Sequence, residues 1–173
     1  MKTLLLLRHA KSSWDHPDLQ DHDRPLSKRG RRAAPLMGQY LAEHDLVPDR
    51  VLCSSAVRTR QTWEQVAACL DDHPPVESDP DLYAASAETL LEIVHSVDDS
   101  IERLMLIGHN PGLEMLAALL VGSGDALAMG RMRLKFPTAA LAELTFEGNS
   151  WQDVVSGSGQ LVRFVRPRDL SPP

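Results

Sequence analysis

Four residues of this chain combine phosphate-binding cations with nitrogen nucleophiles: Arg8, His9, Arg58 and His109. A guanidinium is permanently charged, and its planar fork of donors matches phosphate or carboxylate. Imidazole is the side chain most readily poised as a base or nucleophile near neutral pH. Phosphoryl transfer needs fixed positive donors for the non-bridging oxygens and a nucleophile in line with the leaving group. Brought together, these four side chains suit that chemistry, and it requires no metal.

Each of these residues also has an ordinary interpretation. Taken alone, Arg8 and His9 equally fit a surface arginine beside a hydrogen-bonded histidine. Arg58 and Arg60 fit a pair of solvated cations whose stems lie on the protein surface. The positions of the residues along the chain decide between the interpretations.

The four residues follow apolar runs that are typical of buried parallel strands. The run Leu4–Leu7 is too short to span a membrane and lacks alternation, as expected of a strand covered by helices on both faces. Similar runs occupy residues 50–53 and 104–107. Ligand sites in such sheets lie beyond the carboxyl ends of the strands. We therefore expect Arg8, His9, Arg58 and His109 to meet at one rim of the sheet.

The segments between these runs predict helices and one long loop. Ser27 is expected to cap a helix in which Pro35 forms a kink or marks the true start. Asn110 is expected to cap another helix, with Pro111 at its first position. Residues 14–26 are acidic and interrupted by proline, which predicts a long loop, a kind of segment that is often functional. Further helices are expected over residues 56–70 and 87–97, and further strands over residues 141–146 and 161–165.

Length and composition predict one ordinary globular domain. The chain has 173 residues, and we assign residues 1–166 to a single domain and residues 167–173 to a C-terminal tail. A net charge of −6 argues against a broad nucleic-acid surface, so any anion site must be a local cluster of cations. The sequence contains neither a signal-peptide core nor a membrane span, and we expect a cytoplasmic protein. The sequence leaves the oligomeric state open.

The motifs around these residues resemble the histidine phosphatase superfamily, branch 1. The resemblance rests on Arg8-His9-Ala10 after the leucine run, Asp23-Arg24-Pro25-Leu26 followed by Gly30, residues 54–62, and Gly108-His109. Within that superfamily, Arg-His-Ala-Lys-Ser-Ser-Trp and Gly-His-Asn-Pro-Gly are similar to the SixA-type phosphohistidine phosphatases. The resemblance covers nearly the whole chain. It implies a three-layer α/β/α sandwich with a mostly parallel central sheet, phosphoglycerate-mutase-like, without a large cap insertion.

The resemblance also implies roles for the four residues. His9 would be the nucleophile that becomes phosphorylated, Arg8 and Arg58 would clamp the phosphate, and His109 would stabilise the transferring group. Ser12 is a further candidate phosphate ligand. No cofactor and no metal are expected. The chain departs from the wider superfamily at Ala10, where a glycine is usual, which adds one methyl group beside the site.

The general acid is the second departure. In the mutase-like branch, the acid that protonates the leaving oxygen lies in a segment that residues 82–88 match only loosely. Glu88, Asp15 and Asp21 therefore stay open as candidates, and each of them also fits a capping or solvated carboxylate.

The function expected from these observations is a phosphatase with a phosphohistidine intermediate, acting on a phosphorylated protein or a small phosphorylated substrate. Phosphohistidine in proteins is the favoured substrate. The alternatives are a sugar-phosphate phosphatase, a phosphoglycerate-mutase-like enzyme and, in a different class, a phosphate-recognition module without catalysis. A mutase usually needs a closed pocket, and the chain has no evident inserted lid. His9 is retained, which disfavours a module that only binds.

Overall fold

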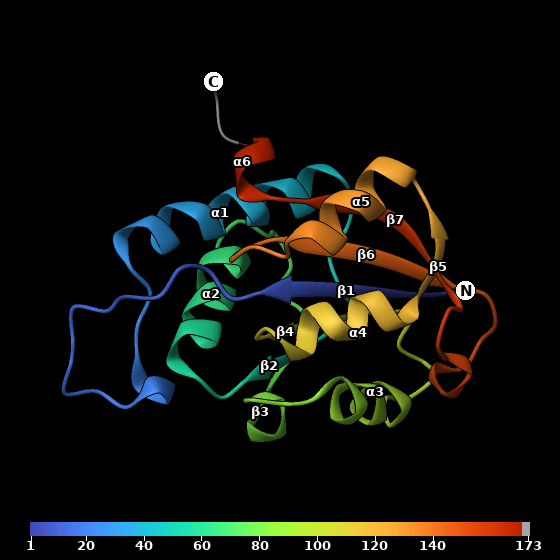
Figure 1. Cartoon of the computed structure of the whole chain (residues 1–173), viewed down its shortest axis with the longest axis horizontal. Coiled ribbons are helices and arrows are strands. Elements are labelled where there is room, and N and C mark those ends of the chain that lie inside the picture. Colours follow the sequence, from blue (N-terminus) through green and yellow to red (C-terminus); the bar gives the residue numbers. More distant parts are fainter. Residues whose placement is uncertain (171–173) are drawn as a thin grey trace.

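The computed structural model describes residues 1–170, which form an α/β fold around one seven-stranded sheet (Figure 1). The strand order is β3-β2-β4-β1-β6-β7-β5. The strands are β1 (Lys2–Arg8), β2 (Arg50–Ser54), β3 (Val76–Asp79), β4 (Arg103–Gly108), β5 (Val121–Gly124), β6 (Leu141–Phe146) and β7 (Gly159–Val165). Only β6 runs against the other strands, because β1–β4, β2–β4, β2–β3 and β5–β7 pair in parallel. The mostly parallel sheet is confirmed.

Helices cover both faces of this sheet (Figure 1). The helices are α1 (Lys28–Glu43), α2 (Val57–Ala67), α3 (Ala87–His95), α4 (Gly112–Leu120), α5 (Ala126–Leu134) and α6 (Pro167–Leu170). Short 3-10 turns lie at Asp21–Asp23, Pro80–Leu82 and Trp151–Asp153. Helices α3, α4 and α5 contribute to one core cluster, and α1 and α2 contribute to the other. The chain is thus a three-layer α/β/α sandwich.

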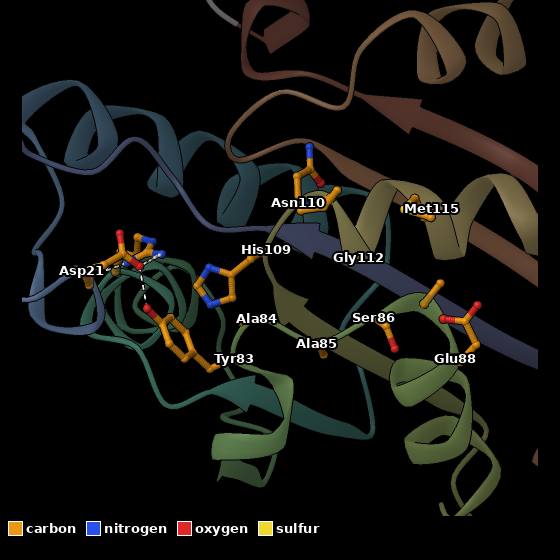
Figure 2. A pocket seen from close by; sticks show the side chains of 13 residues that line it. Asp21, Tyr83, Ala84, Ala85, Ser86, Glu88, His109, Asn110, Gly112 and Met115 are labelled. Carbon is orange, nitrogen blue, oxygen red and sulfur yellow. Dashed lines mark hydrogen bonds and ion pairs between the residues drawn. The ribbon is translucent and has the colours of Figure 1, made fainter.

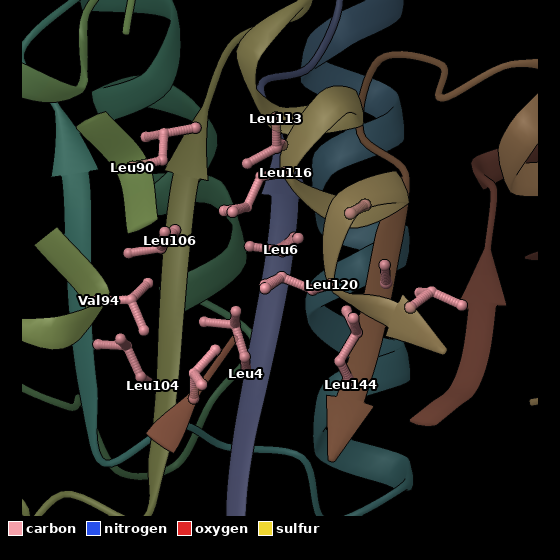
Figure 3. Packing of buried hydrophobic residues seen from close by; sticks show 14 of the residues in the cluster. Leu4, Leu6, Leu90, Val94, Leu104, Leu106, Leu113, Leu116, Leu120 and Leu144 are labelled. Carbon is pink, nitrogen blue, oxygen red and sulfur yellow. The ribbon is translucent and has the colours of Figure 1, made fainter. Parts of the chain in front are cut away.

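The leucine run of β1 joins the two cores. Leu4 and Leu6 pack with the α3 and α4 side, as Figure 3 shows, whereas Leu5 and Leu7 pack with the α1 and α2 side. All four leucines are fully buried. Burial on both faces explains why the run shows no alternation, and it places the end of β1 at the centre of the sheet.

The cap of Ser27 is confirmed, and several other local expectations need correction. Helix α1 begins at Lys28, with Ser27 accepting a hydrogen bond from the Gly30 amide at 3.1 Å, and continues through Pro35. Asn110 does not cap α4: the N-cap residue is Pro111, and Asn110 Oδ1, the atom that would accept a capping bond, has no partner among residues 1–170, while Nδ2 donates to the Phe136 carbonyl at 2.9 Å. Strands β3 and β5 and helix α5 were not expected from the sequence.

The last described residues lie within the expected tail. Residues 167–170 form the short helix α6, and Leu170 packs against the core cluster on the α1 side. Residues 171–173 lie outside the described part of the chain. The division into one domain and a tail stays a prediction. Over residues 1–170, no helix combines the length and the apolarity needed to cross a membrane.

Candidate active site

The carboxyl ends of β1, β2 and β4 meet at one rim, as parallel pairing requires. Strand β1 pairs Arg8 with Gly108 of β4, which places His9 and His109 side by side just beyond the strand ends. Their ring centroids are 5.2 Å apart. A cavity of about 240 Å³ opens here, and we call it the cationic cavity. Its lining residues include Arg8, His9, Ser12, Arg24, Arg58 and His109. The structure therefore brings together all four residues that the sequence singled out, with Ser12 beside them.

His9 is held as a neutral imidazole in one orientation. Its Nδ1 lies 2.7 Å from the Ala10 carbonyl oxygen, so Nδ1 carries the proton and Nε2 keeps its lone pair. The Ala10 amide is itself held by Thr62 Oγ1 at 2.9 Å. Burial lowers the pKa of His9 to about 3, and the nearby charges of Arg58 and Arg8 add to this effect. The ring can act as a nucleophile at neutral pH without first losing a proton.

Arg8 and Arg58 supply the positive field of the cavity. Arg8 donates from Nη1 to the Phe136 carbonyl at 3.0 Å. Arg58 begins the first turn of α2, and its guanidinium donates to the Asp21 carbonyl at 2.7 Å and to Asp21 Oδ2 at 3.0 Å. These contacts fix two charged groups that lie largely out of bulk water. Away from bulk water, their attraction for an anion is stronger.

Arg24 is a third buried cation of the cavity, carried by the acidic loop. Its guanidinium donates to Ser12 Oγ, to the Ser13 carbonyl at 3.2 Å and to Asp21 Oδ1 at 2.9 Å. The exposed ring of Trp14 lies over this guanidinium, with 3.4 Å between Arg24 Cζ and the ring centroid. Arg24 was noticed in the sequence only as part of a motif, and its position at the site depends on how the loop folds back.

His109 is also buried and neutral. Ser54 Oγ lies 2.8 Å from His109 Nε2, and Ser54 Oγ already accepts from the Ala56 amide at 3.3 Å. The Ser54 hydroxyl can donate to Nε2, and in that arrangement the ring proton is on Nδ1. Burial lowers the pKa of His109 to about 4, with Arg58 adding to the effect. His109 can offer a hydrogen bond from a neutral ring.

Unsatisfied polar atoms are concentrated at this cavity. Among residues 1–170, four buried side-chain atoms have no hydrogen-bond partner, and three of them belong to Arg8, His109 and Asn110. These atoms are Arg8 Nε, His109 Nδ1 and Asn110 Oδ1. Buried polar groups are normally paired, so this cluster indicates a place that a polar ligand or ordered water completes.

A second cavity of about 400 Å³ adjoins the first and shares Arg58, His109 and Asn110 with it. We call it the wide cavity. Figure 2 shows Asp21, Tyr83 and His109 at one end of it, and Ser86, Glu88 and Met115 toward the other. Much of the wall is apolar, which suits the carbon skeleton of a leaving group.

The three candidate acids occupy different places. Glu88 is exposed in the first turn of α3 and lines the wide cavity. Asp21 accepts from Tyr83 Oη at 2.6 Å as well as from Arg24 and Arg58. These bonds, that from Tyr83 first, hold the pKa of Asp21 below its usual range, so Asp21 is ionised and has no proton to donate. Asp15 is exposed and lines neither cavity.

Two close backbone approaches explain how the loops at the site are held. A Cβ on Gly30 of α1 would lie 2.2 Å from the Lys11 carbonyl oxygen, so only glycine lets α1 pack against the loop after His9. A Cβ on Gly112 of α4 would lie 2.0 Å from the Ala85 carbonyl oxygen, in the wall of the wide cavity. Both contacts fix a cavity wall against the start of a helix.

Tyr83 was missed by the sequence analysis. Its ring meets those of His22 and His109 edge to face, at centroid distances of 4.9 and 5.4 Å. Only the loose match of residues 82–88 to an acid-bearing segment drew attention to this region.

Comparison with known proteins adds independent information. Residues 4–90 match the model of the histidine phosphatase superfamily (branch 1). An uncharacterised protein of Mycobacterium tuberculosis is 39% identical over 165 residues, which cover 94% of this chain and 100% of that protein. The phosphohistidine phosphatase SixA of Escherichia coli is 27% identical over 156 residues, or 86% of this chain and 91% of SixA. A solved structure from Agrobacterium tumefaciens, assigned to SixA, superposes with a TM-score of 0.81 at 28% identity, covering 96% of this chain and 98% of the other.

Proposed function

This chain belongs to branch 1 of the histidine phosphatase superfamily, and from that premise we propose that it hydrolyses phosphohistidine in proteins through a phosphoenzyme formed on His9. Family membership and the likeness to SixA support a phosphatase. The protein substrate and the individual residue roles are our proposal.

The state of His9 carries this proposal. The Ala10 carbonyl holds the proton on Nδ1, and burial keeps the ring neutral, so Nε2 is a nucleophile at neutral pH. Arg8 and Arg58 line the same cavity and can stabilise the charge on the non-bridging oxygens. In this proposal, phosphate binding and nucleophilic attack thus need only side chains that line the cationic cavity.

The reaction proceeds in two displacements. Nε2 of His9 attacks phosphorus while the P–N bond of the substrate breaks, and the bonding pair goes to the leaving imidazole, which takes a proton from water. Water then attacks the phosphorus of phospho-His9, the P–Nε2 pair returns to His9, and inorganic phosphate and a proton are released. His109 is neutral near pH 7, so we assign it hydrogen bonding to the transferring group rather than proton donation.

In the described part of the chain, no carboxylic acid is held in position to protonate the leaving group, which favours a nitrogen leaving group. Asp21 is held ionised by three donors, so it does not protonate a leaving oxygen. An alkoxide needs such a proton much more than an imidazole does, since a positioned acid is worth about 100- to 10,000-fold. Over residues 1–170 no large insertion stands over the rim, which leaves room for a histidine presented by another protein (Figure 1).

One observation favours a second candidate, a small-molecule phosphatase. Glu88 lines the wide cavity, toward the end away from His109, and this cavity can receive a leaving alcohol. If Glu88 delivers a proton there, sugar phosphates become competent substrates. A mutase and a binding module without catalysis have less support, because the rim carries no large insertion and His9 is in place. A cytoplasmic location likewise remains a prediction.

Specificity constants on matched substrates test the proposal. The purified chain should show a higher kcat/KM for a phosphohistidine peptide than for sugar phosphates or an aryl phosphate under identical conditions. Better turnover of a sugar phosphate, selectively removed by Glu88→Gln, would make Glu88 the acid and the small-molecule function correct.

A further inference from the structure

A third depression adjoins the cationic cavity and shares no lining residue with the wide cavity. It measures about 90 Å³ and shares Lys11 and Thr138 with the cationic cavity. Arg29 of α1, Arg166 directly before α6 and Arg168 within α6 complete its charged lining. We call this depression the basic groove. A ligand that occupies the cationic cavity can therefore extend into the basic groove along one continuous surface.

The charge of this groove is opposite to that of the whole chain. The protein carries a net charge of −6, yet four basic side chains line this one depression. Arg166 is neutralised, since it donates to Asp169 at 3.0 and 2.7 Å. Lys11, Arg29 and Arg168 are exposed and make no ion pair with any residue from 1 to 170. Three unpaired cations thus remain for a ligand.

The cations are of the kind that binds an oxyanion. Arg29 and Arg168 approach from different helices, and each offers a planar fork that fits a carboxylate or a phosphate. Lys11 lies where the groove meets the cationic cavity and can contact anions in both. The groove has room for a single oxyanion group, and nothing in the phosphoryl transfer described above uses it.

We propose that the basic groove binds a second oxyanion of the substrate, carried close to the transferring phosphoryl group. The inference rests on the proposed function, for which this second group is an Asp or Glu side chain near the phosphohistidine. The groove then selects phosphohistidines in acidic surroundings. A second phosphate on a small molecule has the same chemistry, and the experiment separates the two sources.

The test compares two phosphohistidine peptides that differ only in Asp or Asn beside the modified histidine. The parent chain should prefer the acidic peptide in kcat/KM by about 3- to 10-fold, the product of two exposed ion pairs. Arg29→Gln with Arg168→Gln should bring this ratio close to one. Lys28→Gln with Arg32→Gln is the matched control, because both residues are exposed on α1, line no part of the groove and change the net charge equally.

The result is the ratio of kcat/KM for the two peptides, so a general loss of activity in a variant does not change it. The preference should shrink at high salt, because exposed charges are screened. No preference in the parent chain, or a preference that survives in the Arg29 and Arg168 double variant, overturns the proposal.

If neither peptide is hydrolysed, the proposed function fails and the groove is still tested. The same variants are then assayed with a sugar monophosphate and the corresponding bisphosphate. A bisphosphate preference that the groove variant loses and the control keeps would support the groove, with phosphate as its second anion. Equal turnover of the two sugars by the parent would refute it.

Discussion

The two buried histidines should make folding stability depend on pH in a measurable way. Burial lowers the pKa of His9 to about 3 and that of His109 to about 4, whereas both rings titrate near 6.5 in the unfolded chain. Well above pH 6.5 neither state binds a proton at these rings. As the pH falls below 6.5, the unfolded state binds protons that the folded state does not bind, so stability is lost.

The magnitude follows from the same values. Between pH 7 and pH 5 each ring should cost about 2 kcal/mol of unfolding free energy, and the pair about 4 kcal/mol. The loss continues until the pH passes the folded-state pKa of each ring, near 4 for His109 and near 3 for His9. The range from pH 7 to pH 5 lies above the titration of the carboxylates, so they contribute little to this difference.

Urea unfolding at pH 7 and pH 5 measures the effect. His9→Asn and His109→Asn should each remove about half of the pH-dependent loss, whatever they do to stability at pH 7. His73→Asn is the control, because His73 is exposed in the folded chain as it is in the unfolded chain, and it should keep the parent's dependence. A parent chain that loses less than about 1 kcal/mol, or a His9 variant that loses as much as the parent, would refute the assignment of buried neutral rings.

Four further outcomes are expected. His9→Ala should be inactive, and rapid quenching of the parent with labelled substrate should trap an acid-labile, base-stable phosphoenzyme; label on serine or cysteine would contradict the mechanism. Chelator should leave turnover unchanged, whereas loss of activity restored by a divalent ion would show that a metal takes part. Arg58→Ala should lower turnover by raising the activation free energy by about 2 to 4 kcal/mol, as for the loss of one oxyanion donor. Arg60→Ala, at an exposed residue, is the control that keeps activity. Gly30→Ala should lower the Tm and turnover together, because its Cβ meets the Lys11 carbonyl oxygen; an unchanged Tm would mean that α1 shifts without cost.

The sequence predicts the rim of the site well, because parallel pairing leaves little freedom there. Short apolar runs without alternation are typical of parallel strands covered on both faces, and such strands place their carboxyl ends together. The convergence of His9, Arg58 and His109 follows directly from this rule. Ser12 comes shortly after the same strand and lines the same cavity, and its role as a phosphate ligand stays a prediction.

The loops around the rim could not be predicted in the same way. Asp21 meets Tyr83, which is 62 residues away, and Arg58, and no local pattern encodes these contacts. Asn110 has the sequence context of a helix cap, but α4 begins at Gly112 with Pro111 as its N-cap residue, and the Asn110 amide donates to the Phe136 carbonyl. Residues 121–124 include two glycines, which are disfavoured in strands, yet they form an edge strand because they pair with the backbone of β7.

The central position of β1 has a consequence for the synthesis of this protein. Strand β1 precedes all other strands in the chain, but it pairs with β4, where Leu4 faces Leu104, and with β6, where Lys2 faces Phe146. At about 5 to 20 residues per second, the leucines of β1 emerge from the ribosome roughly 5 to 20 s before β4 can cover one edge. During that time they form an exposed, aggregation-prone segment that a chaperone can bind. The rim that holds Arg8 and His9 is complete only after β6 has been made, so a nascent chain cannot transfer phosphate until most of the protein has been translated.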